Sequence, residues 1–125
     1  MEEKKDVRIL IIEDNEIDLL LATRYLTRAG YSQITNAGDV SQGVKRAVED
    51  KPDLVISDTV LPDSDGFDAC SQIRKVLGEQ KPKIIITTGS VDAVDAVRAR
   101  KAGADDYCAK TSDCALLLEA VKKLV

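Results

Sequence analysis

Segments typical of β-strands and of α-helices alternate five times along this 125-residue chain. The strand-like segments are short apolar runs, and each is followed by a longer segment with apolar residues at helical spacing. The expected strands cover residues 7–12, 33–36, 54–57, 83–87 and 106–109. The expected helices cover residues 16–29, 40–49, 66–78, 92–102 and 113–124. Gly30 is expected to end the first helix and Asp113 to cap the last. Five such units with short connections predict an α/β domain, with an open parallel sheet and helices on both faces.

Aliphatic side chains must supply the core of this chain. Hydrophobic residues make up 44% of the sequence, whereas aromatic residues make up 3% and Trp is absent. Val, Ile, Leu and Ala suit parallel strands that are covered by helices on both faces. A closed barrel of eight strand–helix units needs roughly 250 residues and is therefore excluded. Because no linker, low-complexity tract or internal repeat interrupts the pattern, we expect one domain spanning residues 1–125.

The charge and the cysteine content argue against several kinds of function. A net charge of −4 argues against direct nucleic-acid binding, because proteins that bind the phosphate backbone carry a basic face. The chain contains no His, which excludes Ser-His and Cys-His catalysis within it. Its three cysteines fit no zinc-binding pattern. We expect Cys70 and Cys108 to be small core residues.

The sequence carries no signal for export or for membrane insertion. Residues 1–6 lack the apolar stretch of a signal peptide, and no apolar run approaches the length of a membrane span. We therefore expect a cytoplasmic protein that does not contact a membrane.

Residues capable of chemistry follow four of the expected strands. Glu13 and Asp14 close the first strand, Asp58 directly follows the third, Thr88 follows the fourth, and Lys110 follows the fifth. The carboxyl ends of parallel strands meet at one edge of a sheet, where open α/β folds bind their ligands. We therefore expect these side chains to converge on one site.

Three carboxylates in one partly dry site would repel one another. A divalent cation relieves that repulsion, and ligation by oxygen alone suits Mg²⁺ best. We expect Asp14 to bind the metal directly and Glu13 to bind it through water, with Asp58 also part of the metal site. The backbone carbonyl of Val60 can complete the metal site.

The same residues suit phosphoryl transfer, which depends on positioning and charge neutralisation more than on covalent chemistry. Asp58 would be the nucleophile. Lys110 would hold one phosphoryl oxygen as a compact positive charge. Thr88 would donate its hydroxyl to another, and the small Gly89 beside it leaves room.

The residues described above belong to four segments of the chain. The segments are Ile11-Ile12-Glu13-Asp14-Asn15, Asp58-Thr59-Val60-Leu61-Pro62 with Asp65-Gly66, Thr87-Thr88-Gly89, and Gly103-Ala104-Asp105-Asp106-Tyr107-Cys108-Ala109-Lys110. Together they resemble the receiver domain of bacterial two-component response regulators. Each segment is weak evidence alone, but all four occur in the order and at the spacing of that family. The resemblance implies the flavodoxin-like fold, with five parallel strands in the order 2-1-3-4-5.

The resemblance also implies a role in signalling. Asp58 would take a phosphoryl group from the phosphohistidine of a histidine kinase or phosphotransfer protein. The phosphoryl group adds about two negative charges near Thr88. If the Thr88 hydroxyl moves toward it, Tyr107 can swing inward to fill the space behind. The altered surface would change the binding of an output partner, so the domain would be a switch in a phosphorelay rather than an enzyme.

The residues at positions 111 and 60 bear on the chemistry that the resemblance implies. Thr111 follows Lys110, where the family usually has Pro, often after a cis bond. A cis bond before a non-proline residue costs roughly 3 kcal/mol, so we expect a trans bond or a rearranged loop. Val60 lies two residues after Asp58, beside the route of the hydrolytic water in this family, and offers that water no side-chain hydrogen bond. We therefore expect slow loss of the phosphoryl group.

Other functions suit the sequence less well. A calcium loop over residues 61–72 would have Leu61 as its first ligand and Gln72 in place of the closing Glu. A flavin carrier of this fold needs a phosphate-binding loop after the first strand, where this chain has acidic residues. An aspartyl phosphatase would need an acid in place of Val60. The remaining alternative is a receiver-like interaction module that binds its partners without phosphorylation.

Overall fold

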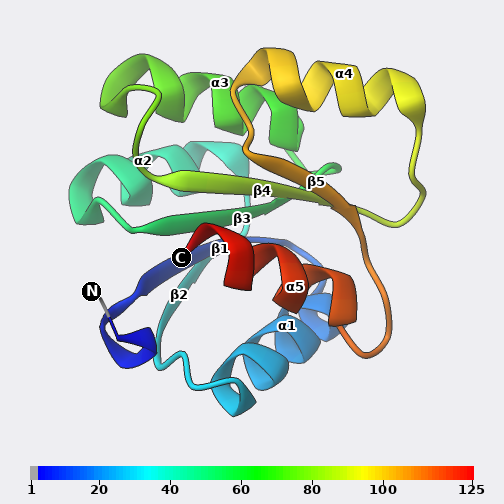
Figure 1. The fold of residues 1–125 in the computed structure, drawn as a ribbon. Coiled ribbons are helices and arrows are strands. Elements are labelled where there is room, and N and C mark those ends of the chain that lie inside the picture. The colour runs from blue at the N-terminus through cyan, green and yellow to red at the C-terminus, as the bar shows by residue number, and fades with distance from the viewer. Residues whose placement is uncertain (1–2) are drawn as a thin grey trace.

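A computed structural model describes residues 3–125 and contains a five-stranded parallel sheet in the order β2-β1-β3-β4-β5 (Figure 1). The strands are β1 (Arg8–Ile12), β2 (Gln33–Ala37), β3 (Leu54–Asp58), β4 (Lys83–Thr88) and β5 (Asp106–Ala109). The expected α/β class and the flavodoxin-like strand order are therefore confirmed.

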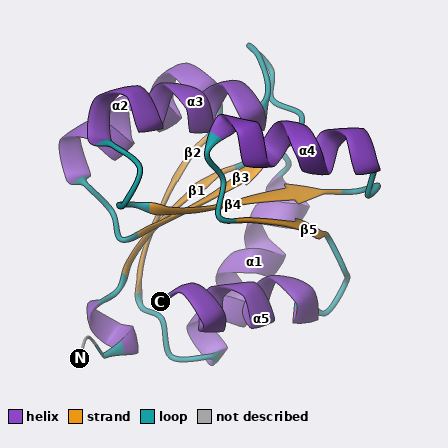
Figure 2. Ribbon diagram, turned by 45° about the horizontal axis from the view of Figure 1, so that its top comes forward, coloured by secondary structure: helices purple, strands orange, loops and turns teal. Residues whose placement is uncertain are grey.

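Helices cover both faces of the sheet (Figure 2). On one face lie α2 (Val40–Asp50), α3 (Gly66–Leu77) and α4 (Ala93–Ala102), and on the other lie α1 (Glu16–Arg28) and α5 (Ala115–Leu124). The observed bounds agree with the expected helices to within one or two residues. One 3₁₀ turn, η1 (Lys4–Asp6), precedes the sheet and was not expected from the sequence.

Each central strand divides its side chains between two apolar cores, because successive residues of a strand point to opposite faces. In β1, Ile9 and Ile11 belong to the core beneath α1 and α5. Leu10 and Ile12 belong to the core beneath α2 and α3. Burial on both faces explains why β1, β3 and β4 each contain a continuous run of three or four apolar residues rather than an alternating pattern.

Four helices begin with a side chain that accepts a hydrogen bond from the backbone N–H of their first turn. These N-cap residues are Asn15, Asp39, Asp65 and Asp92. Such caps fix where each helix starts and therefore how the preceding loop leaves its strand. Gly30, with φ of 106°, follows α1 as the sequence predicts.

The last helix starts differently from the expectation. Asp113 does accept a hydrogen bond, at 3.0 Å, but its donor is the backbone N–H of Ala115. The helix starts only at Ala115, after Cys114 in a left-handed conformation with φ of 54°. The expected start at residue 113 was thus two residues early.

The cysteines are free thiols with a packing role. Cys70 is buried, as expected, whereas Cys108 is only partly buried against the core beneath α1 and α5. Burial raises the pKa of both thiols to about 11, so they are protonated at neutral pH.

The expectation of no signal peptide concerns residues 1–6, of which residues 1 and 2 lie outside the described part of the chain. Within residues 3–125, no helix combines the length and the apolar character needed to cross a membrane.

Candidate functional site

Three carboxylates meet at the carboxyl edge of the sheet, as the sequence predicts. Glu13 and Asp14 follow β1 and Asp58 ends β3, and these two strands are hydrogen-bonded neighbours in register up to the Ile12–Ser57 pair. One oxygen from each carboxylate lies within 4.8 Å of the others. Glu13 is buried, Asp58 is partly buried and Asp14 is exposed. Three hard oxygen donors that converge in this way fit a Mg²⁺ ion.

The backbone around Asp58 is fixed by a tightly folded loop. The backbone N–H of Gly66 donates to the carbonyl of Thr59 at 2.9 Å, and the N–H of Thr59 donates to the carbonyl of Thr87. A Cβ atom on Gly66 would lie only 2.3 Å from the carbonyl oxygen of Asp58. The glycine therefore permits α3 to start against the end of β3, and this contact holds Asp58 at the edge of the sheet.

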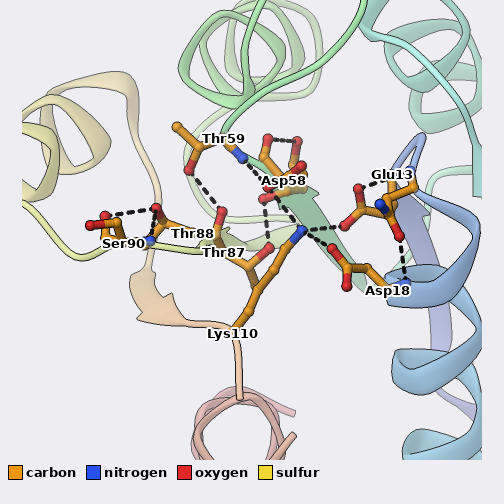
Figure 3. A network of polar contacts seen from close by, with 10 residues as sticks. Glu13, Asp18, Asp58, Thr59, Thr87, Thr88, Ser90 and Lys110 are labelled. Carbon is orange, nitrogen blue, oxygen red and sulfur yellow. Dashed lines mark hydrogen bonds and ion pairs between the residues drawn. The ribbon is translucent and has the colours of Figure 1, made fainter. Parts of the chain in front are cut away.

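Lys110 joins the carboxylates from the end of β5 (Figure 3). Its Nζ lies 2.7 Å from Glu13 Oε1, 2.7 Å from Asp18 Oδ2 and 3.2 Å from Asp58 Oδ1. The backbone N–H of Lys110 donates to the carbonyl of Thr88 at 2.7 Å, which continues the pairing of β5 with β4. Lys110 thus contacts the expected phosphoacceptor directly.

The residue after Lys110 does not prevent this contact. Among the described residues the only cis peptide bond precedes Pro82, so the bond between Lys110 and Thr111 is trans. This agrees with the energetic expectation for a non-proline residue.

Asp18 also belongs to this network, although the sequence did not predict it. It lies in the first turn of α1, four residues after Asp14, and the loop between them places its side chain beside the edge where the three acids meet. A helix that starts directly after a strand of the site can add a side chain from its first turn. The position of Asp18 in the first turn of such a helix was the sequence signal that could have identified it.

Burial and charge act on the ionisation of Glu13 and Lys110. Burial, together with the charge of Asp58, raises the pKa of Glu13, and Lys110 only partly opposes this rise. Burial by itself would lower the pKa of Lys110, but the hydrogen bonds to Asp18 and Glu13 and the charge of Asp58 raise it above its ordinary value. Lys110 is therefore a permanent cation in this site.

Thr88 and Tyr107, which are expected to move after phosphorylation, are hydrogen-bonded to other groups in this structure. The buried hydroxyl of Thr88 donates to the carbonyl of Ser90 at 2.9 Å and accepts from the Ser90 N–H at 3.1 Å. The hydroxyl of Tyr107 accepts from the backbone N–H of Asp92 at 3.4 Å. No hydrogen bond within residues 3–125 joins Thr88 to Asp58.

Val60 lies at the rim of the site. Together with Asp14, Asp18 and Asp58 it lines an open hollow in the surface. Val60 is 73% exposed, so its side chain faces solvent beside the expected phosphoacceptor.

Comparisons with known proteins agree with this geometry. A family model described as the response regulator receiver domain matches residues 9–122. The alkaline phosphatase synthesis transcriptional regulatory protein PhoP of Bacillus subtilis is 37% identical over 105 residues, which are 82% of this chain but only 42% of that protein. A probable chemotaxis protein CheY of Rhizobium etli is 36% identical over 104 residues, covering 83% of this chain and 81% of that protein.

The fold also matches solved structures. A response regulator protein from Burkholderia pseudomallei, solved with a phosphorylated aspartic acid, a calcium ion and citrate, superposes with a TM-score of 0.80 at 29% identity. The match covers 92% of this chain and 66% of that one.

Proposed function

Because this chain belongs to the response regulator receiver domain family, we propose that Asp58 accepts a phosphoryl group from a histidine kinase or a phosphotransfer protein. Residues 1–125 would form one receiver domain, and phosphorylation would switch its binding to other proteins. The observation that carries this proposal is the contact of Lys110 with Asp58, at 3.2 Å, beside a cluster of three carboxylates.

We propose that Glu13, Asp14 and Asp58 hold Mg²⁺, with the backbone carbonyl of Val60 as a further ligand. The convergence of their oxygens within 4.8 Å supports this assignment. When bound, Mg²⁺ would supply positive charge that offsets the carboxylates and the incoming phosphoryl oxygens. The Burkholderia pseudomallei relative contains both a phosphorylated aspartic acid and a calcium ion, which supports a cation beside the phosphoacceptor.

In the phosphorylation step, a carboxylate oxygen of Asp58 attacks the phosphorus of the donor phosphohistidine. The new P–O bond forms as the P–N bond breaks, and the electron pair of that bond leaves with the imidazole nitrogen. The N–H of Thr59 donates to Asp58 Oδ1 at 2.8 Å and fixes the orientation of the carboxylate. The Lys110 ammonium contacts the same oxygen, Asp58 Oδ1, and would shift this contact to a phosphoryl oxygen.

The switch requires Thr88 to change its hydrogen bond. Its hydroxyl now donates to Ser90, and it would instead donate to a phosphoryl oxygen on Asp58. That movement would release the turn at residues 88–90, which leads into α4. Tyr107, whose hydroxyl lies at the start of α4, would then change its position and alter the surface formed by α4, β5 and α5.

The output of the switch is protein binding. PhoP of Bacillus subtilis is more than twice as long as the part that this chain matches, and its name describes a transcriptional regulator. CheY of Rhizobium etli matches over most of its length. We propose that the phosphorylated domain acts on an effector domain or on a separate partner protein, and that it does not itself bind nucleic acid.

Intact mass spectrometry tests the proposed function. The protein is incubated with phosphoramidate or acetyl phosphate, with and without Mg²⁺. We expect a gain of one phosphoryl group that depends on Mg²⁺ and is absent in Asp58→Asn. Asp68→Asn is the matched control, because Asp68 is also a partly buried acid but lies in α3. This variant should gain the phosphoryl group normally. No gain in the unsubstituted protein would favour an interaction module that works without phosphorylation.

A further inference from the structure

Lys110 has one partner that does not belong to the proposed metal site. Asp18 Oδ2 lies 2.7 Å from the ammonium, as close as Glu13 Oε1. The Asp18 side chain is 37% exposed, whereas that of Glu13 is 5% exposed. Lys110 thus contacts two acids of the site and, in addition, one acid from α1.

The contacts of Lys110 compete with the proposed metal. Two of its three carboxylate partners, Glu13 and Asp58, also belong to the acid cluster that would hold the cation. A dication bound to these oxygens repels a nearby ammonium, and the ammonium draws the same oxygens away from the dication. Lys110 must therefore weaken its contacts with Glu13 and Asp58 when the metal binds.

Part of the surroundings of Lys110 is apolar and offers no partner to a displaced ammonium. Its side chain lines a cavity of about 40 Å³, whose apolar walls include Leu21, Ala22, Cys114 and Leu117. A charge moved toward such walls without a partner would be destabilised. Asp18 lines the same cavity and already binds the ammonium.

We propose that Asp18 is a positioning residue. It would hold the Lys110 ammonium beside the site when Glu13 and Asp58 bind Mg²⁺. By holding the ammonium beside the site, Asp18 favours metal binding and keeps Lys110 within reach of a phosphoryl oxygen. This role rests on the proposed function, because it needs the metal site at Glu13, Asp14 and Asp58.

The sign of the effect follows from the contacts. Without the Asp18 carboxylate, Glu13 and Asp58 become the remaining charged partners of Lys110 in this network. The ammonium then binds them more strongly, and Mg²⁺ has to displace a stronger competitor. Loss of the Asp18 charge should therefore weaken Mg²⁺ binding.

The test is a calorimetric titration of the full chain with Mg²⁺. Asp18→Asn should weaken Mg²⁺ binding by roughly three- to tenfold, the effect expected of one partly exposed charged hydrogen bond. Glu16→Gln is the matched control, because it also removes one negative charge from the first turn of α1. It should weaken binding by less than about twofold. Asp18→Glu should restore most of the affinity.

A second pair of variants isolates the route through Lys110. In a Lys110→Ala background, adding Asp18→Asn should change Mg²⁺ affinity no more than adding Glu16→Gln does. Equal losses in Asp18→Asn and Glu16→Gln in the presence of Lys110 would overturn the role of Asp18 and leave the metal site intact. A failure of the unsubstituted protein to bind Mg²⁺ would overturn the proposed metal site and this role together.

Discussion

The ammonium of Lys110 lies 2.7 Å from Glu13 Oε1, although the two residues are 97 positions apart in the sequence. This ion pair spans the carboxyl edge of the sheet, from the loop after β1 to the end of β5. It joins the buried acid of the proposed metal site to the cation that contacts Asp58. Removing Lys110 would leave the buried Glu13 carboxylate without its cation, so the pair couples the stability of the edge to its chemistry.

Replacement of Lys110 should separate metal binding from phosphorylation. In Lys110→Ala we expect the rate of phosphorylation by phosphoramidate to fall by about 100-fold, the cost of losing one preorganised charge at the reacting group. Mg²⁺ affinity should not fall, since a competitor for Glu13 and Asp58 has been removed. Lys101→Ala, an exposed position in α4, is the control. A parallel loss of Mg²⁺ affinity would contradict the competition between Lys110 and the metal.

A polar side chain at position 60 should shorten the lifetime of the phosphoryl group. Val60 is 73% exposed beside Asp58 and cannot orient a water molecule by a hydrogen bond. In Val60→Asn we expect hydrolysis to become several-fold faster, because the added amide can position the water. Loss of the phosphoryl group is followed by intact mass after removal of the donor.

The control for this change is Val76→Asn, which alters an exposed valine in α3, outside the residues that line the site's hollow. Hydrolysis in Val60→Asn that is unchanged or slower than in the unsubstituted protein would count against the role assigned to position 60.

A side chain at position 66 should destabilise the fold. In Gly66→Ala the new Cβ would meet the Asp58 carbonyl oxygen at 2.3 Å, so the loop between β3 and α3 has to move. We expect a loss of about 1–3 kcal/mol in the free energy of unfolding, measured with urea. Gly38→Ala is the matched control, since its Cβ would meet nothing within 4 Å. Equal stability of the two variants would show that the loop relaxes freely.

Asp53 should make stability depend on pH. Burial alone would raise its pKa, but the Lys81 ammonium at 2.8 Å and the Arg8 N–H at 2.9 Å outweigh burial and lower it. A carboxylate with a lowered pKa adds stability above its unfolded pKa, near 4, and loses that contribution as the pH falls through the folded pKa. Asp53→Asn should therefore be less stable at pH 7, and the difference should shrink below about pH 4.

Urea unfolding at a series of pH values measures this effect, with Asp50→Asn, an exposed acid three positions away, as the control. A stability difference for Asp53→Asn that stayed constant from pH 7 to pH 3 would contradict the assignment.

The sequence predicted the parts of the site that depend on strand ends. Glu13, Asp14, Asp58 and Lys110 were placed correctly because parallel strands bring their carboxyl ends to one edge, whatever the loops do. The strand order could not be predicted in the same way, because the apolar pattern indicates five parallel strands but not their order in the sheet. The order came from the resemblance to receiver domains and is confirmed by the structure.

Features decided by single side chains and loop backbones were not predicted. The contact of Asp18 with Lys110 depends on the rotamers of the short Asp18 side chain and the long Lys110 side chain, which are 92 positions apart in the sequence. The late start of α5 depends on the left-handed Cys114, a conformation that its residue type does not indicate. Likewise, the bond from the Thr88 hydroxyl to Ser90 belongs to a local turn that hydrophobic periodicity does not encode.

The most direct test of the central claim is to identify the phosphorylated residue chemically. Borohydride reduces an aspartyl phosphate to homoserine, and peptide mass spectrometry then locates the modified position. After treatment with phosphoramidate and Mg²⁺, we expect homoserine at position 58 and at no other acid of the chain. Homoserine at Asp14, Asp63 or another aspartate, with Asp58 unchanged, would contradict the assignment of Asp58 as the phosphoacceptor.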